Sequence, residues 1–393
     1  MSRPKILFIT PRMPLPLLSG GESWIYGLAK NLAKTAELHL FSFLEPGFEP
    51  HQVAHSVFLE KVFKTVSYRK KEPFPDSKDL PDSPARHFSP GAAERINGII
   101  EKEGIDLAHI FFQDLLFYSA EIKKKLPLVY TEIDSSWLSP FNSYLRENAG
   151  ARGLGNMRET LKYRAYAKKF LRNFQAVTYL SREDYGDIKG YTKGARALYT
   201  PNALELGAYA NRGKVKREKN TIFFIGNYLH YPNADAALTL TLKVYPAVKE
   251  KVKDARLILA GPFPPEELKK TAGGGIEITD YVKNHLERFE KYALMAAPVR
   301  YGRGVKTKVL EAFASGLPVA GYHETFCGLE TGPSGNCVLK AGNARELAGK
   351  IVDAFRGKYD LEKMAANSRE LSRRHDIAEV SRKVLELYLK LCA

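Results

Sequence analysis

The hydrophobic positions of this chain fall in short apolar runs that alternate with segments of helical periodicity. Runs of this kind indicate strands, and helices between them favour βαβ units and a parallel sheet. In the first half we predict strands at 5–10, 38–43, 107–112, 128–133 and 176–180, with helices at 22–35 and 156–173. In the second half we predict strands at 221–226, 256–261, 276–279, 293–298, 317–321 and 337–340. The pattern predicts an α/β protein.

Two series of strands in 393 residues suggest two domains, because single cores stop growing below this length. We predict an N-terminal Rossmann-like domain at 1–200, a charged linker at 201–220 and a second such domain at 221–374. In open α/β sheets ligands bind at the carboxyl ends of the strands, so two doubly wound domains that face each other would enclose the ligand in an interdomain cleft. The proline-rich stretch 65–92 is predicted to be a long loop.

Composition narrows the setting and the partners. Three cysteines without Cys-x-x-Cys spacing favour neither a disulfide framework nor a zinc site. No apolar run reaches membrane-spanning length and no leader pattern is present, so we expect a cytoplasmic protein, soluble or peripheral at the inner membrane face. The net charge of +16 implies an anionic partner, which could be nucleotide phosphate, an anionic membrane surface or nucleic acid.

The stretch YGRGVKTKVLEAFASG (301–316) combines glycines, cations and one carboxylate. Gly302 and Gly304 allow close backbone approach before a helix predicted to begin near Val305, whose first amides could bind an anion. Lys308 and Glu311 share the polar side of that helix, and an ionised carboxylate is suited to accept hydrogen bonds from a vicinal diol such as ribose. The cations that would surround a diphosphate are Arg300, Arg303, Lys306 and Lys308. A plain surface helix remains the alternative.

Other polar residues follow predicted strands. Asp134 could face the cleft or cap the next helix, and Tyr228, His230 and Asn233 could line a nucleotide pocket or simply pack in a loop. Gly20 and Gly21 do not form Gly-x-Gly-x-x-Gly, so the dinucleotide fingerprint of dehydrogenases is missing. His51 and His55 lack a third ligand and no Asp-x-Asp is present, so we expect no metal site.

The second half, from FIGNYLHYPNAD (224–235) through ALMAAPVRYGRGVKTKVLEAFASGLPVAGYHETFCGLE (293–330), resembles the C-terminal domain of retaining GT-B glycosyltransferases. The first half is similar more loosely, at 6–34, 127–137 and 200–205. The resemblance is to family 4-like bacterial enzymes of surface-polysaccharide assembly. It implies a GT-B fold and a last helix, within 375–393, that packs back on the N-domain. It also implies metal-independent transfer from a UDP- or GDP-linked sugar, which is a substrate rather than a cofactor.

The resemblance also implies roles for single residues. Glu311 would bind the ribose, and Tyr281 and Val282 would contact the base through backbone groups. Gly20 and Gly21 would lie against the donor phosphates and the acceptor, and Gly226 would belong to the donor site. His109 would lie near the donor sugar, with a histidine of the core or of a loop as the alternative. The acceptor would be a glycan, a lipid-linked sugar or another hydroxyl compound.

The chain departs from the family at two points. Many members place a second Glu eight residues before the ribose-binding one, where this chain has Arg303, or Gly302 if a one-residue insertion is allowed. Members also commonly carry Arg and Lys in the loop after the first strand of the C-domain, where His230 and Asn233 stand here. Charge neutralisation and catalysis would then fall to Arg303 and Lys308 with their basic neighbours.

Three other functions stay open on the sequence. A nucleotide-sugar epimerase shares the fold, but its paired acid and base carboxylates are not recognisable. A glycosyltransferase acting on nucleic acid would suit the positive charge, although no basic module interleaved with aromatic residues stands out. A non-catalytic nucleotide-sugar-binding protein would explain the missing first Glu.

Overall fold

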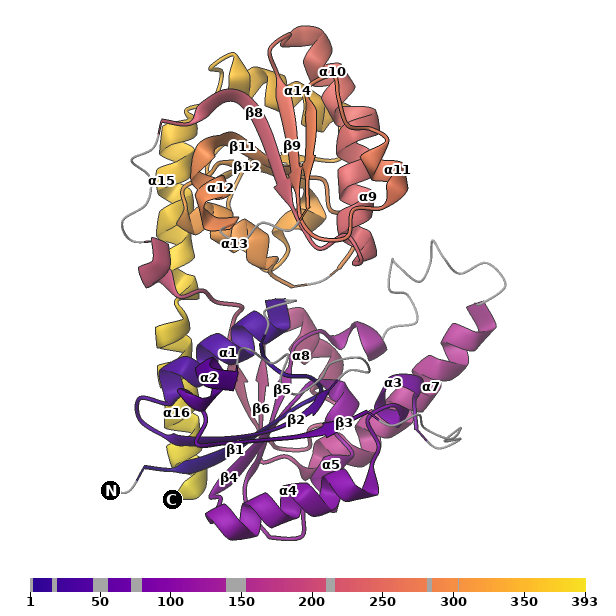
Figure 1. Ribbon diagram of the computed structural model, residues 1–393, viewed down its shortest axis with the longest axis vertical. Helices are drawn as coiled ribbons and strands as arrows, with labels where there is room; N and C mark the ends of the chain where they lie inside the picture. Colours follow the sequence, from indigo (N-terminus) through magenta and orange to yellow (C-terminus); the bar gives the residue numbers. More distant parts are fainter. Residues whose placement is uncertain are drawn as a thin grey trace. The chain divides into compact units, whose positions relative to one another are not determined.

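The computed structural model describes residues 3–15, 20–44, 56–71, 80–138, 153–209, 216–280, 285–302 and 304–393. The chain divides into two compact units, which are Met1–Asn202 with Ile377–Ala393, and Ala203–Asp376. Each unit is a parallel sheet covered by helices (Figure 1). None of the described helices has both the length and the apolar composition that crossing a membrane requires.

The first unit is built on a seven-stranded sheet in the order β3-β2-β1-β4-β5-β6-β7, with every neighbouring pair parallel. Its strands are β1 (Lys5–Thr10), β2 (Glu37–Leu44), β3 (Thr65–Lys70), β4 (Leu107–Phe111), β5 (Leu128–Glu132), β6 (Ala176–Tyr179) and β7 (Arg196–Tyr199). Its α-helices are α1 (Gly20–Leu32), α2 (Ser56–Glu60), α3 (Asp82–Ala85), α4 (Pro90–Glu103), α5 (Tyr118–Glu121), α7 (Gly153–Phe170), α8 (Arg182–Ile188) and α16 (Ile377–Cys392).

Helices bury both faces of this sheet, which is why its central strands are nearly continuous apolar runs. On one face α4, α5 and α7 contribute side chains such as Ile96, Tyr118 and Phe170 to a core with the strands. On the other face α1 packs along α16, so the end of the chain completes the first unit (Figure 1). Strand order reverses between β1 and β4, and the loops after these strands therefore diverge.

The second unit has a six-stranded parallel sheet in the order β10-β9-β8-β11-β12-β13. Its strands are β8 (Glu218–Ile225), β9 (Arg256–Ala260), β10 (Ile276–Thr279), β11 (Tyr292–Ala297), β12 (Val319–Tyr322) and β13 (Val338–Ala341). Its helices are α9 (Tyr231–Thr239), the π-helical segment η7 (Leu240–Val244), α10 (Tyr245–Lys251), α11 (Glu266–Lys269), α12 (His285–Lys291), α13 (Thr307–Ala314), α14 (Ala344–Phe355) and α15 (Leu361–Ser372).

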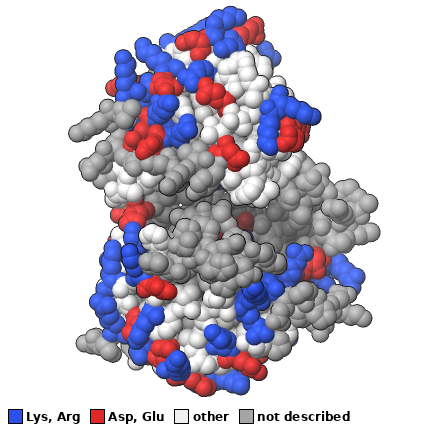
Figure 2. All heavy atoms as spheres, viewed as in Figure 1, with Lys and Arg blue, Asp and Glu red and all other residues white. Residues whose placement is uncertain are grey.

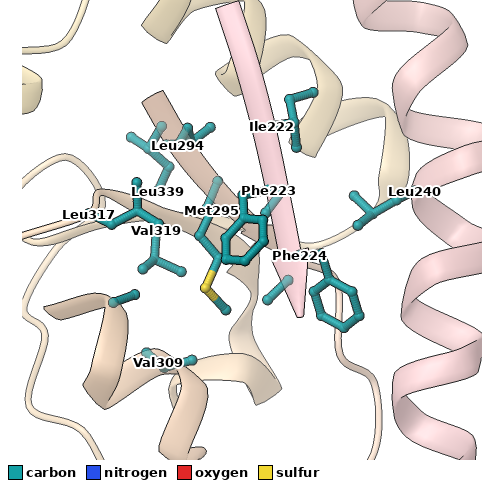
Figure 3. Close-up of a cluster of buried hydrophobic side chains, with 14 of the residues drawn as sticks. Ile222, Phe223, Phe224, Leu240, Leu294, Met295, Val309, Leu317, Val319 and Leu339 are labelled. Carbon is teal, nitrogen blue, oxygen red and sulfur yellow. The ribbon is translucent and has the colours of Figure 1, made fainter. Parts of the chain in front are cut away.

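The core of the second unit lies on both sides of β8. Successive side chains of a strand point to opposite faces, and Figure 3 shows Phe223 beside Met295 while Phe224 and Leu240 lie on the other side of the strand. Val309 brings α13 onto this core and is fully buried. The apolar face of α13 therefore fixes the helix at the carboxyl end of the sheet, where strand order reverses between β8 and β11.

The structure differs from the sequence-based expectations at the edges of the sheets. The stretch 65–92 is not one long loop, because it contains β3 and α3 and reaches α4, while its residues 72–79 lie outside the described part. The prolines that suggested a loop all come after β3 in the sequence. Strand β7 was missed because an edge strand needs little apolar pattern and its first two residues are exposed. Strand β8 begins at Glu218, inside the segment assigned to a linker.

Candidate donor site

The loop before α13 contains two glycines in left-handed backbone conformation. Gly302 has φ 90° and Gly304 has φ 70°, values that side-chain-bearing residues rarely adopt. The helix then begins at Thr307, two residues later than the sequence predicts, and its N-cap Lys306 gives no side-chain hydrogen bond to the first turn. Instead, Lys306 Nζ donates to the carbonyl oxygens of Gly302 (2.8 Å) and Gly304 (3.0 Å). The basic loop is thus held closed by hydrogen bonds from the ammonium group of its own Lys306.

Lys308 points back toward the end of β8. Its Nζ donates to Asn233 Oδ1 at 2.6 Å and lies 4.4 Å from the ring centroid of Phe224. A Cβ atom at Gly226 would come within 2.8 Å of the same Nζ, so glycine at 226 leaves room for the ammonium group. Burial lowers the pKa of Lys308 to about 7, although the negative charge of Glu311 raises it in part. Lys308 is therefore a cation whose charge depends on what binds beside it.

The loop after β8 is tied to its surroundings by backbone and amide contacts. Asn233 Nδ2 donates to the carbonyl of Asn227 (2.8 Å), so the amide that holds Lys308 is itself oriented. Gly261, which follows β9, has φ 138°, and a Cβ there would lie 1.9 Å from the carbonyl oxygen of Gly226. Two glycines from neighbouring strands thus allow the two loops to touch. His230 is exposed at the N-cap of α9.

Arg300 has a partner that the sequence does not reveal. Its guanidinium contacts the carboxylate of Asp235 through two hydrogen bonds, Nε to Oδ2 at 3.0 Å and Nη2 to Oδ1 at 2.5 Å. The guanidinium also lies 5.1 Å from the ring centroid of Tyr301. Because Asp235 neutralises it, Arg300 adds less positive charge to the basic loop than the sequence suggests.

The position of α13 is set from its other end by Arg217. Nη1 donates to the carbonyl oxygens of Phe289 (2.7 Å) and Tyr292 (2.9 Å), and Nη2 donates to those of Ser315 (3.1 Å) and Gly316 (3.0 Å). Ser315 is the C-cap of α13, so one side chain joins the end of this helix to the start of β11. Arg217 lies in the segment assigned to a linker, and nothing in its sequence context marks this role.

The described site residues of the second unit therefore gather at one edge. Gly226, Gly304, Lys306, Lys308 and Glu311 lie at the carboxyl end of β8 or in the loop and helix that face it. Tyr281, Val282 and Arg303 lie outside the described residues, as do His51 and His55. Sequence reasoning missed Asp235 and Arg217. Asp235 could have been suspected from its place on the first helix after β8, opposite the basic loop.

In the first unit, Gly20 and Gly21 form the first turn of α1 rather than a loop before it. A Cβ at Gly21 would lie 2.8 Å from the ring of Phe112, which follows β4, so glycine permits this contact. Asp134 is exposed, and its Oδ1 accepts a hydrogen bond of 2.9 Å from the amide of Ser136 in the short helix Ser135–Leu138. This is the capping arrangement that the sequence left open for Asp134.

His109 is buried in the core of the first unit. Nε2 is 2.6 Å from Thr131 Oγ1, Nδ1 is hydrogen-bonded to the Tyr388 hydroxyl of α16, and the ring stacks on Phe111 with centroids 4.0 Å apart. Burial holds its pKa well below the ordinary value. Both ring nitrogens are engaged and the side chain has no exposed surface. His109 therefore packs in the core of the first unit, and its place near the donor sugar stays a prediction.

Two buried carboxyl groups near β5 were not anticipated. Glu132, at the end of the strand, accepts hydrogen bonds from Tyr130 Oη (3.0 Å) and the Asp134 amide (3.1 Å). Its pKa is raised to about 8, first by burial and then by the charge of Asp184. Asp184 accepts from the amide and hydroxyl of Ser135 at 3.0 and 2.9 Å. Both carboxyl groups serve the turn that carries Asp134.

On the visible face of the molecule (Figure 2), the described charged side chains are spread out rather than concentrated. On the face shown in Figure 2, Lys and Arg occur in several separate groups, many with Asp or Glu nearby. Among the described residues, no group of three or more His, Cys, Asp or Glu side chains is arranged to hold a metal ion.

Comparison with known proteins finds a family match for the segment that contains this edge of the second unit. Residues 219–356 match the family described as Glycosyl transferases group 1, and the match includes Gly226, Lys308 and Glu311. This segment is similar to group 1 glycosyltransferase domains. A phosphatidyl-myo-inositol mannosyltransferase of Mycobacterium leprae is 26% identical over 206 residues, which are 50% of this chain and 54% of the relative. The chain thus spans about half the length of this curated relative.

Solved structures are similar to this chain over nearly its whole length, beyond the segment that the family match covers. HepE of Anabaena in complex with UDP has a TM-score of 0.70 at 16% identity, and 98% of this chain and 100% of that one are covered. Sucrose-phosphate synthase of Thermosynechococcus elongatus has a TM-score of 0.71 at 14% identity, with 99% of both chains covered. At these identities the likeness shows the fold, and the chain has the GT-B fold with two Rossmann-like units.

Proposed function

We propose that this chain transfers a sugar from a nucleotide-diphosphate donor to an acceptor hydroxyl, with retention at the anomeric carbon and without a metal ion. The observation that carries the proposal is the pair Lys308 and Glu311, one turn apart on α13 behind a glycine-containing basic loop. A diphosphate at the start of the helix would meet its first amides, Lys306 and Lys308. A ribose one turn further would meet the Glu311 carboxylate.

The family match and the UDP complex of HepE support a nucleotide donor. We assign the donor site to the second unit, with Arg303, Tyr281 and Val282 as further members of it. The acceptor is assigned to the first unit, near Gly20, Gly21 and Asp134. We propose a glycan or lipid-linked acceptor, handled at an anionic membrane surface on the cytoplasmic side.

In the proposed reaction the bond from the anomeric carbon to the diphosphate oxygen breaks, and the diphosphate leaves with the bonding electrons. The acceptor oxygen forms the new bond on the same face, and its proton passes to the leaving diphosphate. Negative charge grows on the diphosphate in the transition state, where the α13 amides and Lys308 would stabilise it without reorganising. Lys308 would gain a full positive charge as the diphosphate approaches.

The test begins with a thermal-shift panel of UDP- and GDP-linked sugars. A donor that binds the native state should raise the melting temperature, and Glu311→Ala should lose this shift. Glu250→Ala, an exposed glutamate on α10, is the matched control and should keep it. A Glu311→Ala variant that is stabilised as strongly as the wild type would contradict the ribose assignment.

Transfer itself is tested by chromatography of reactions that contain the stabilising donor and a panel of acceptor glycans and glycolipids. A glycosylated product with the α-linkage of an α-donor would support retention. If the donor binds but is neither hydrolysed nor transferred to any acceptor, the result would instead favour a nucleotide-sugar-binding protein. Two results together would favour a nucleic-acid acceptor: the protein retards DNA in a gel-shift assay in a salt-sensitive way, and the DNA becomes glycosylated.

A further inference from the structure

The loop after β9 holds an aromatic side chain in an unfavourable backbone conformation. Phe263 has φ 62°, in the left-handed region that bulky residues rarely adopt, and its side chain is 58% exposed. Strain in a folded protein persists where the surrounding structure enforces it, and it is concentrated at functional sites. Burial of the ring does not repay this strain, because more than half of its surface faces solvent. The exposure of the ring therefore calls for a binding partner.

The surrounding contacts place Phe263 beside the proposed donor site. The preceding Gly261 touches the carbonyl oxygen of Gly226, and the amide of Tyr228 donates to the carbonyl of Pro262 at 3.1 Å. The loop after β9 is therefore fixed to the loop after β8, which faces Lys308. On its other side, the amide of Gly261 donates to the carbonyl of Thr279 at the end of β10 (3.0 Å).

Two exposed aromatic side chains follow the strands at this edge in the described part of the second unit. Tyr231 is 37% exposed, but its ring is already paired with that of Tyr301 at a centroid distance of 5.7 Å. Phe263 has no ring contact with any other described residue. A planar ligand that reaches this edge would therefore find one open aromatic face.

We propose that Phe263 is the platform on which the nucleobase of the donor stacks. The inference rests on the proposed donor site: with the diphosphate at the start of α13 and the ribose at Glu311, the base must extend toward one of the neighbouring loops. Every nucleobase has a π face, so a stacking residue contributes affinity for either uracil or guanine and selects the base only weakly. Hydrogen-bonding groups elsewhere would set the choice of base.

The experiment compares UDP, GDP and inorganic pyrophosphate by isothermal titration calorimetry. Phe263→Ala should weaken UDP and GDP binding by about 10-fold or more, because base stacking is lost, and should leave pyrophosphate binding unchanged. Phe263→Trp should bind both nucleotides at least as tightly as the wild type. Leu242→Ala removes a side chain of similar exposure (57%) from the π-helical segment and should change none of the affinities.

The possible failures are distinguishable. If UDP and GDP bind the wild type and Phe263→Ala binds them equally well, the stacking role is wrong while the donor site stands. If neither nucleotide binds the wild type, the donor site itself is wrong and the stacking role falls with it. Phe263→Gly separates folding from binding: it should raise the melting temperature by relieving the backbone strain, and still lose nucleotide affinity as Phe263→Ala does.

Discussion

Lys308 Nζ donates a 2.6 Å hydrogen bond to Asn233 Oδ1, joining the first turn of α13 to the helix that follows β8. The amide oxygen accepts this bond but carries no formal charge, and burial lowers the pKa of Lys308 to about 7. A lysine held in this way is partly neutral near physiological pH. An anion bound beside it would restore the proton, because opposite charge favours the charged form.

Donor binding should therefore be accompanied by proton uptake at Lys308. Calorimetry of UDP binding at pH 8, in buffers of different ionisation enthalpy, should show uptake of part of a proton in the wild type and less in Lys308→Met. Above about pH 7 the wild-type affinity should fall with rising pH, because the free lysine loses its proton. Lys308→Met should bind about 10-fold more weakly at pH 6 and lose this dependence.

The control for this prediction is Lys243→Ala, which removes an exposed lysine from the π-helical segment of the same unit. This variant should keep both the affinity and the proton uptake of the wild type. Equal proton uptake in Lys308→Met and the wild type would show that the proton goes elsewhere, for example to the diphosphate.

Arg217→Met should destabilise the second unit and displace α13. The change removes four hydrogen bonds to backbone carbonyls, one in α12, one at the start of β11 and two at the end of α13. Bonds from a charged donor are stronger than neutral ones, and we expect a loss of about 3 kcal/mol in the free energy of unfolding. Urea denaturation measures it, with Arg345→Met, a change at an exposed residue of α14, as the control. An unchanged free energy of unfolding would contradict the role of Arg217 in holding α13.

Glu132 should make the first unit less stable as the pH rises. Its pKa is about 8 in the folded protein against an ordinary 4.5, so the folded state holds its proton more tightly. Its contribution is complete below pH 4.5 and is lost progressively as the pH rises to about 8. Glu132→Gln keeps a neutral side chain at every pH and should be more stable than the wild type at pH 8.

Urea denaturation at pH 5, 6.5 and 8 measures this effect. The raised pKa of Asp184 acts in the same direction, so part of the slope should persist in Glu132→Gln. The exposed Glu183→Gln serves as the control and should follow the wild type. Parallel stability curves for the wild type and Glu132→Gln would contradict the raised pKa.

Tyr388→Phe should loosen α16 from the first unit. The tyrosine hydroxyl is hydrogen-bonded to His109, and both side chains are fully buried. Removing the hydroxyl leaves His109 Nδ1 unsatisfied and should cost about 1–3 kcal/mol. Amide hydrogen exchange along 377–392 should become faster. If exchange is unchanged while transfer is abolished, His109 and Tyr388 would belong to the chemistry rather than to the packing.

The central strands were predictable because a strand that is buried on both faces requires apolar residues at nearly every position. The runs at β1, β4, β8 and β11 consist almost wholly of apolar residues, and the structure has strands there with ends displaced by a few residues at most. Strand β7 could not be predicted from apolar runs. Its four residues, Arg196–Tyr199, are half-buried or exposed at the edge of the sheet, so no apolar pattern was required of them.

Within the site, the sequence indicated which residue types would meet, and the tertiary structure decided their partners. The glycines and cations before α13, followed by Glu311, were readable because they are close together along one loop and helix. The partner of Arg300 is 65 residues away on α9, and the partner of His109 is 279 residues away on α16. Local pattern carries no information about contacts at such separations.

The sequence by itself thus determined the α/β class, the order of most strands and a candidate anion site at the start of one helix. Only the tertiary structure showed that His109 belongs to the core, that Arg217 holds α13, and that Lys308 is paired with an uncharged amide. The physical reason is that periodicity and composition reflect burial, which each segment experiences alone. Hydrogen bonds, ion pairs and pKa values depend on which distant segments the fold brings into contact.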